Sequence, residues 1–178
     1  MDFEVIPATL EALPIFVRLW PLYQYDLSVV GGVLTNSEGL FEDEGAVNID
    51  YANDLRVWFQ RPGHLFPYLI RVDGRAAGFA MIGGAPSNSP KGADFFVHEF
   101  FLMRPFRGQG VAAGVMAQLF TRHRGKWELW VIPENVPALR FWRKVITAEL
   151  GAAIAETQEY KPSWESEAVV MKFRNGGM

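Results

Sequence analysis

Apolar and polar residues follow one another along the chain in patterns that predict alternating strands and helices. Strands are predicted at residues 3–6, 67–72, 77–82, 95–103, 127–132, 152–160 and 167–173. Helices are predicted at 9–17, 22–27, 111–124 and 135–151, and residues 31–54 are predicted to form a long loop with one helical turn. The pair Asp73-Gly74 between two apolar runs is a strong signal for a tight hairpin.

The clearest predicted helix begins at Val111. Val111, Val115 and Leu119 recur at every fourth position, and the same spacing one residue further on widens this apolar stripe. Strands joined by a tight turn pair antiparallel, whereas a strand–helix–strand unit over 95–132 implies a parallel pair. We therefore expect an α/β fold with a central mixed, mostly antiparallel sheet of six to seven strands and helices on both of its faces.

Composition narrows the possible functions. The 178 residues suggest a single domain over 1–178, with 173–178 as a loose tail. The absence of cysteine excludes thiol nucleophiles and thiolate metal sites, and the three histidines lack metal-like spacing, so we expect no metal. A net charge of −3 argues against a nucleic-acid partner. No apolar run is long enough to span a membrane, and the acidic N-terminus does not resemble a secretory signal, so we expect a cytoplasmic protein without a membrane partner.

A Gly-rich segment, residues 104–112, lies between a predicted strand and the helix that begins at Val111. Glycines at such a junction let several unpaired backbone N–H groups point at one spot, and the helix dipole adds partial positive charge there. Arg104 and Arg107 bring cations to the same place. The segment therefore predicts binding of a diphosphate or a similar anion.

Three kinds of diphosphate site compete for this segment. The phosphate loop of nucleotide triphosphatases needs Gly-Lys-Ser/Thr, which is absent. The dinucleotide-binding pattern is met in its relaxed form by residues 108–113, with Glu128 about 20 residues on, but only one strand–helix–strand unit is present. The third possibility is a coenzyme A site.

Three motifs in order support the third possibility. The segment 107–112, Arg-Gly-Gln-Gly-Val-Ala, fits Arg/Gln-x-x-Gly-x-Gly/Ala. The strand that leads into this segment, residues 98–105, contains an acidic residue followed by apolar residues and ends in Arg-Pro. The third motif, Asn-Val-Pro-Ala-Leu-Arg-Phe-Trp at 135–142, is similar to Asn-x-x-Ala-x-x-Phe-Tyr. With these motifs the chain resembles the Gcn5-related N-acetyltransferase (GNAT) superfamily over nearly its whole length.

The resemblance implies how a cofactor binds. Acetyl-CoA would lie between two parallel strands that splay apart, here 95–103 and 127–132. Its pantetheine arm would pair with the backbone of the first strand, and backbone N–H groups near 106–112 would hold its pyrophosphate. Local backbone preferences favour Asn135 as the cap of its helix, and the resemblance implies that it also contacts the pantetheine arm. The expected cofactor-binding residues are Phe101, Leu102, Met103, Arg107, Gly108, Gln109, Gly110, Val111, Ala112, Asn135, Ala138 and Phe141.

The resemblance also implies direct attack of a primary amine on the thioester in a ternary complex, without an acyl-enzyme. Glu99 is the expected base, acting directly or through a water, while His98 should point to the opposite face of a regular strand with a structural role. If the strand bulges, the two residues could exchange roles. Trp142 stands where the family often has the tyrosine that protonates the leaving thiolate, and an indole N–H cannot act as an acid near pH 7. Either Trp142 only orients the sulfur, or water, the substrate or Tyr160 supplies the proton.

The expected acceptor is a small-molecule or peptide amine. Tyr25 and Asp26 are the expected substrate-binding residues, with Tyr23 and the loop acids at 42–44 as further candidates. A homodimer is expected from the resemblance. Because the usual tyrosine is missing, a non-catalytic acyl-CoA sensor on the same fold is the alternative function.

Overall fold

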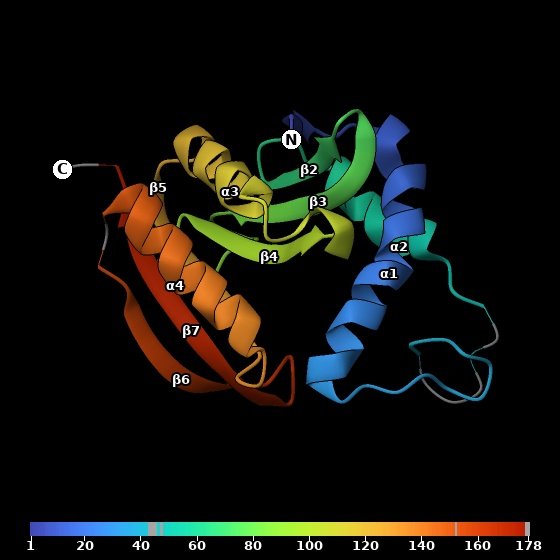
Figure 1. Ribbon diagram of the computed structural model, residues 1–178. Coiled ribbons are helices and arrows are strands. Elements are labelled where there is room, and N and C mark those ends of the chain that lie inside the picture. The colour runs from blue at the N-terminus through green and yellow to red at the C-terminus, as the bar shows by residue number, and fades with distance from the viewer. Residues whose placement is uncertain (43–45, 47, 152, 177–178) are drawn as a thin grey trace.

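The computed structural model describes residues 1–42, 46, 48–151 and 153–176. Its centre is a seven-stranded sheet in the order β1-β2-β3-β4-β5-β7-β6 (Figure 1). The strands are β1 (Phe3–Pro7), β2 (Leu65–Val72), β3 (Arg75–Gly84), β4 (Phe95–Leu102), β5 (Gly125–Val131), β6 (Ala155–Lys161) and β7 (Ser166–Asn175). β4 and β5 pair parallel, and the other five neighbouring pairs are antiparallel. The predicted mixed, mostly antiparallel sheet is confirmed.

Helices cover both faces of the sheet (Figure 1). α1 (Leu13–Gly31) and α2 (Tyr51–Arg56) bury their apolar residues in one core, which is centred on Phe16 and Phe79. α3 (Val111–Arg122) and α4 (Val136–Leu150) bury theirs in a second core on the other face, which includes Trp127. No helix in the described part of the chain is long and apolar enough to cross a membrane.

The hairpin between β2 and β3 turns at Asp73 and Gly74, as the sequence predicts. Both residues have positive φ, 48° and 74°, which matches the right-handed twist of the flanking strands. The two strands then pair from Val72 opposite Arg75 to Leu65 opposite Gly83.

The sequence predicts two helical segments at 9–17 and 22–27, and the structure has one long helix there instead. Thr9 precedes a short 3-10 turn, and α1 then runs through Pro21 without a break. Trp20 and Tyr23 lie on either side of this proline and both pack against Phe79, with ring centroids 5.7 and 5.6 Å apart. Burial of one continuous apolar stripe thus outweighs the hydrogen bond that the proline cannot make. The helical turn expected within 31–54 corresponds to the start of α2 at Tyr51.

The expectation of a loose tail from residue 173 is wrong for residues 173–175. β7 continues to Asn175, whose side chain is buried at the junction of α3 and β5. Its Oδ1 accepts hydrogen bonds from Gly125 N at 2.8 Å and Trp127 Nε1 at 3.1 Å. Its Nδ2 donates to the carbonyl oxygens of His123, at 2.8 Å, and Phe120. A buried polar group with this many partners fixes the end of the strand.

We predict that Asn175→Ala lowers the free energy of unfolding by about 2–4 kcal/mol, because it leaves buried donors and acceptors without partners. Urea denaturation would measure the loss. Arg174→Ala, which changes the exposed neighbouring residue, is the matched control and should cost less than about 1 kcal/mol. Equal losses in the two variants would contradict the proposed role of Asn175.

Candidate active site

β4 carries a β-bulge at His98. Val97 pairs with Ile82 and Glu99 pairs with Met81, so His98 is an extra residue without a partner on β3. A bulge interrupts the alternation of side chains, and accordingly His98 contacts Trp58 while Glu99 bonds to Tyr23, two residues that both pack on the core under α1 and α2. The expectation for a regular strand, that these two side chains point to opposite faces, is therefore wrong, and the alternative of a bulged strand is the one that the structure has.

Glu99 is a half-buried carboxyl group that faces α1. The hydroxyl of Tyr23 donates a hydrogen bond to Glu99 Oε2. Desolvation raises the pKa of Glu99 to about 7, although the hydrogen bond from Tyr23 acts in the opposite direction. The same burial, and the negative charge of Glu99, raise the pKa of Tyr23 well above its usual value. A carboxyl group with a pKa near 7 can accept and release protons at physiological pH.

The ring of His98 packs against β3 and against the loop that follows β3. Its Nε2 lies 3.0 Å from Asn88 O, and its ring contacts Trp58 with centroids 5.0 Å apart. A Cβ at Gly83 would clash with the backbone oxygen of Asn88 and would lie 2.5 Å from His98 Nε2, so glycine is needed at that position. Desolvation lowers the pKa of His98, which keeps the ring neutral near pH 7. These contacts support a structural role.

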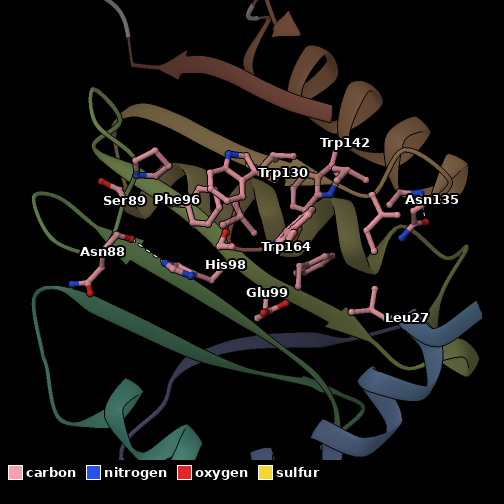
Figure 2. A pocket seen from close by; sticks show the side chains of 18 of the residues that line it. Leu27, Asn88, Ser89, Phe96, His98, Glu99, Trp130, Asn135, Trp142 and Trp164 are labelled. Carbon is pink, nitrogen blue, oxygen red and sulfur yellow. Dashed lines mark hydrogen bonds between the residues drawn. The ribbon is translucent and has the colours of Figure 1, made fainter. Parts of the chain in front are cut away.

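A cleft of about 710 Å³ runs through the sheet where β4 and β5 separate (Figure 2). The two strands share only the pairs from Phe95–Trp127 to Val97–Leu129, although β4 continues to Leu102 and β5 to Val131. Residues from both faces of the sheet line the space. They are Tyr23, Leu27, Ser87, Asn88, Ser89, Pro90, Phe96, Val97, His98, Glu99, Phe100, Leu129, Trp130, Val131, Ile132, Asn135, Ala138, Trp142, Ser163 and Trp164.

The first turns of α4 form one wall of this cleft. Asn135 caps the helix, as predicted, by accepting a hydrogen bond from Ala138 N at 3.2 Å. Its amide NH₂ has no protein partner in the described chain and so can donate to a ligand. Trp142 lines the cleft but is largely buried against Phe100. Phe141 stacks on Phe100 with nearly parallel rings 5.7 Å apart and does not line the cleft.

The Gly-rich turn follows directly on β4 and a 3-10 turn (Arg104–Phe106), and it leads into α3. Gly108 and Gly110 have φ values of 75° and 82°, and a Cβ at either would meet open space. Their conformation therefore requires glycine for backbone reasons, while the space beside them stays free. Gln109 folds back to donate a hydrogen bond to Pro105 O at 3.0 Å.

The backbone amides at this turn are available to a ligand. Within the described residues, the N–H groups from Gly108 to Ala112 have no backbone acceptor. Val111 is buried in the core, so only its N–H can serve a ligand, whereas Ala112 is half-buried. Such N–H groups at the N-terminus of a 12-residue helix favour the binding of an anion.

Arg107 and Asp26 are engaged with each other. Arg107 donates to Asp26 and, through Nε, to Leu102 O at 2.6 Å, and Arg104 donates to Asp26 at 2.8 Å. These two arginines lower the pKa of Asp26 against the effect of its burial, which raises it. Asp26 thus ties α1 to the Gly-rich turn and does not line the cleft. Its expected role in binding an amine is not supported by this position.

The other predicted site residues lie around the end of β4 or away from the cleft. Phe101 and Leu102 have buried side chains, and Met103 N donates to Ala77 O at 2.8 Å. Tyr25 and Tyr160 are mostly exposed and do not line the cleft. Of the loop acids at 42–44, residues 43 and 44 lie outside the described residues, and Glu42 does not line the cleft.

Several lining residues were not predicted from the sequence. They include Phe96, Trp130, Ser163, Trp164 and the loop 87–90. Each looks like an ordinary core or turn residue by its local pattern, and only the sheet brings them together. The described residues contain no group of three or more His, Asp or Glu side chains that could hold a metal ion.

Comparison with known proteins agrees with this geometry. The sequence matches the Acetyltransferase (GNAT) family over residues 35–146, more than half of the chain, and the protein therefore belongs to this family. The resemblance in the motifs is thus confirmed. No protein of curated function matches the sequence significantly.

Solved structures share the fold. PaiA N-acetyltransferase from Thermoplasma acidophilum, in complex with coenzyme A, is 12% identical, with 98% of this chain and 99% of that chain covered and a TM-score of 0.68. AAC(6')-Ib in complex with ribostamycin and coenzyme A is 15% identical, with 98% and 94% covered and a TM-score of 0.66. An acetyltransferase from Thermus thermophilus is 11% identical, with 97% and 96% covered and a TM-score of 0.65.

We predict that Glu99 makes the stability of the fold depend on pH. The pKa of its carboxyl group rises on folding from 4.5 to about 7, so its stabilising contribution is complete below pH 4.5 and is lost as the pH rises through about 7. Because the side chain faces an open cleft, we expect the wild type to lose about 1–3 kcal/mol relative to Glu99→Gln between about pH 5 and pH 8.

Urea denaturation at several pH values would measure this difference. Glu134→Gln, which alters a glutamate that does not line the cleft, is the control and should keep the pH dependence of the wild type. If Glu99→Gln also kept it, Glu99 would not titrate with a raised pKa.

Proposed function

We propose that this protein transfers an acetyl group from acetyl-CoA to a primary amine by direct attack in a ternary complex. The observation that carries the proposal is the position of Glu99, whose half-buried carboxyl group faces the cleft that opens between β4 and β5. Membership of the GNAT family supports acyl transfer from acetyl-CoA as the general chemistry. The coenzyme A complexes of PaiA and AAC(6')-Ib support the same co-substrate.

The residues present fit coenzyme A. The free amides from Gly108 to Ala112 would hold its pyrophosphate, and the open space beside Gly108 and Gly110 leaves room for it. Beyond Val97, β4 has no partner on the β5 side among the described residues, so its backbone can pair with the pantetheine arm. The amide NH₂ of Asn135 and the methyl group of Ala138 would contact the same arm from α4.

Glu99 would prepare the acceptor for attack. As a carboxylate it accepts a proton from the substrate ammonium, directly or through a water, and the free amine then attacks the thioester carbonyl. A C–N bond forms and the C–S bond breaks. Of the two protons that the ammonium loses, one ends on the thiol of coenzyme A and the other passes to solvent.

Trp142 would orient the leaving sulfur, since its indole N–H can donate a hydrogen bond but cannot supply a proton. Tyr160 lies outside the cleft, so the thiolate would take its proton from water or from the acceptor. The tryptophan at position 142, where the family often has tyrosine, also favours a second function, acyl-CoA sensing without turnover. Release of free coenzyme A in the presence of amines would separate the two functions.

The acceptor in this proposal is a small-molecule amine. Among proteins of this fold, AAC(6')-Ib has been crystallised with ribostamycin and with kanamycin, which supports a small acceptor. A cytoplasmic location and a homodimer stay predictions.

We predict that Gly110→Asp weakens coenzyme A binding at least about tenfold relative to Gly110→Asn. Both side chains strain the positive φ of Gly110 to a similar extent, since Asp and Asn both tolerate the left-handed region, but only Asp places a negative charge beside the pyrophosphate. Calorimetry would give the Kd of each variant, and urea denaturation should show similar stability. Equal Kd values would place the pyrophosphate elsewhere.

We predict that kcat/KM rises with pH to a plateau above an apparent pKa near 7, which is that of Glu99. Tyr23→Phe removes the hydrogen bond that lowers this pKa, so the whole profile should move to higher pH. Glu99→Gln should lower kcat by about 100-fold or more while coenzyme A still binds.

All proteins would be assayed with the same amine, so that titration of the acceptor cancels in the comparison. Tyr25→Phe, which changes an exposed tyrosine two residues away, should keep the profile of the wild type. Unchanged turnover in Glu99→Gln would remove Glu99 as the base.

A further inference from the structure

Three aromatic side chains line the cleft on the β4–β5 surface that Glu99 also faces, and together they form an aromatic wall (Phe96, Trp130 and Trp164; Figure 2). Phe96 and Trp130 meet edge to face with centroids 5.0 Å apart, and Trp164 meets Trp130 edge to face at 5.7 Å. Phe96 is largely buried and also contacts His98 edge to face, so the exposed part of the wall that can pack against another flat group is formed by Trp130 and Trp164.

Trp130 at the centre of the wall is held in one orientation. Its indole N–H donates to Glu128 Oε1 at 2.6 Å, and the carboxylate of Glu128 is buried. The ammonium group of Lys161 lies 4.2 Å from the centroid of the Trp130 ring and pairs with Glu159 at 2.8 Å. Because Lys161 already covers one ring face, a substrate cation has no place there. The wall is therefore suited to an uncharged flat group.

Trp164 lies in the tight turn between β6 and β7, close to the cleft. Its backbone N–H donates to Lys161 O at 3.0 Å, which fixes the turn. The side chain of Trp164 lines the cleft and yet is 40% exposed. Tyr160 on the same hairpin is more exposed but does not line the cleft. An exposed tryptophan at the edge of a cleft gains most when a ligand covers it.

The wall lies at a fixed separation from the proposed base. Phe96 lies opposite Gly83 and Glu99 lies opposite Met81, two positions apart on β3, which corresponds to about 7 Å along the strand. The bulge at His98 keeps Glu99 on the same side as Phe96. A ligand that reached both would carry its amine a few bonds away from its flat group.

Charge in the cleft limits the acceptor further. Among the described lining residues, Glu99 is the only carboxylate, and none is Lys or Arg. His98 is held neutral by the desolvation that lowers its pKa. A second ammonium group on the acceptor would enter the cleft without a partner, which is unfavourable.

We infer that the acceptor is an arylalkylamine, in which one primary amine is joined by a short linker to an aromatic ring, with the amine at Glu99 and the ring against the aromatic wall. The inference rests on the proposed acetyl transfer and names the substrate class of the same site. It also excludes polycationic amines as preferred acceptors.

Four commercially available amines test this inference with acetyl-CoA: 2-phenylethylamine, 2-cyclohexylethylamine, n-butylamine and spermidine. We expect kcat/KM for 2-phenylethylamine to exceed that for n-butylamine and for spermidine by at least about tenfold, as burial of a ring predicts. It should exceed that for 2-cyclohexylethylamine by about threefold or more, because only the aromatic ring gains from edge-to-face contacts.

Variants of Trp164 give an independent measurement. Trp164→Ala should raise KM for 2-phenylethylamine about tenfold, with kcat and the rate with n-butylamine little changed. Trp164→Phe should restore most of the affinity. Leu22→Ala, which changes an exposed apolar residue that does not line the cleft, should behave like the wild type.

The outcomes separate the inference from the proposed function. Turnover that favours spermidine or n-butylamine would overturn the inference and leave acetyl transfer intact, and equal rates with 2-cyclohexylethylamine would overturn the aromatic preference. If no amine released coenzyme A, acetyl transfer would fail. Calorimetry of 2-phenylethylamine with the coenzyme A complex would then decide: binding that is lost in Trp164→Ala supports the site, and absence of binding overturns it.

Discussion

The separation of β4 from β5 after Val97 is the constraint on which the rest of the site depends. β4 stays paired with β3 as far as Leu102, and β5 stays paired with β7 as far as Val131. The bulge at His98 directly follows the last pair that β4 and β5 share, and a bulge bends its strand and increases its twist. Each strand is thus held by its outer neighbour while β4 turns away, and a cleft forms where a regular sheet would have continued.

The chemistry proposed for this cleft depends on the packing under α1. The ring of Tyr23 packs against Trp20, Phe79 and Phe101. This packing positions the Tyr23 hydroxyl to donate its hydrogen bond to Glu99. The same packing withdraws the carboxyl group from water and raises its pKa. The hydrophobic core on that face of the sheet therefore sets both the position and the proton affinity of Glu99.

Features that depend on neighbouring residues could be predicted well. The Gly-rich turn before α3 and the Asn135 cap follow from local backbone preferences, and both lie where the sequence predicts them. The ion pairs of Asp26 could not be predicted, because nothing local shows that two arginines from another element neutralise it. A bulge in this strand could be named only as an alternative for a similar reason, since its register depends on a strand more than ten residues away.

By itself, the sequence determined the kind and order of most elements, the sheet with helices on both faces, the Gly-rich turn and the family. These depend on hydrophobic periodicity and on glycine, proline and capping residues, which act over a few positions. Only the tertiary structure decided that His98 and Glu99 share a face, that α1 runs through Pro21 and that Phe96, Trp130 and Trp164 form one wall. Such features depend on contacts between strands and turns far apart in the chain, where each residue alone has the pattern of an ordinary core or loop position.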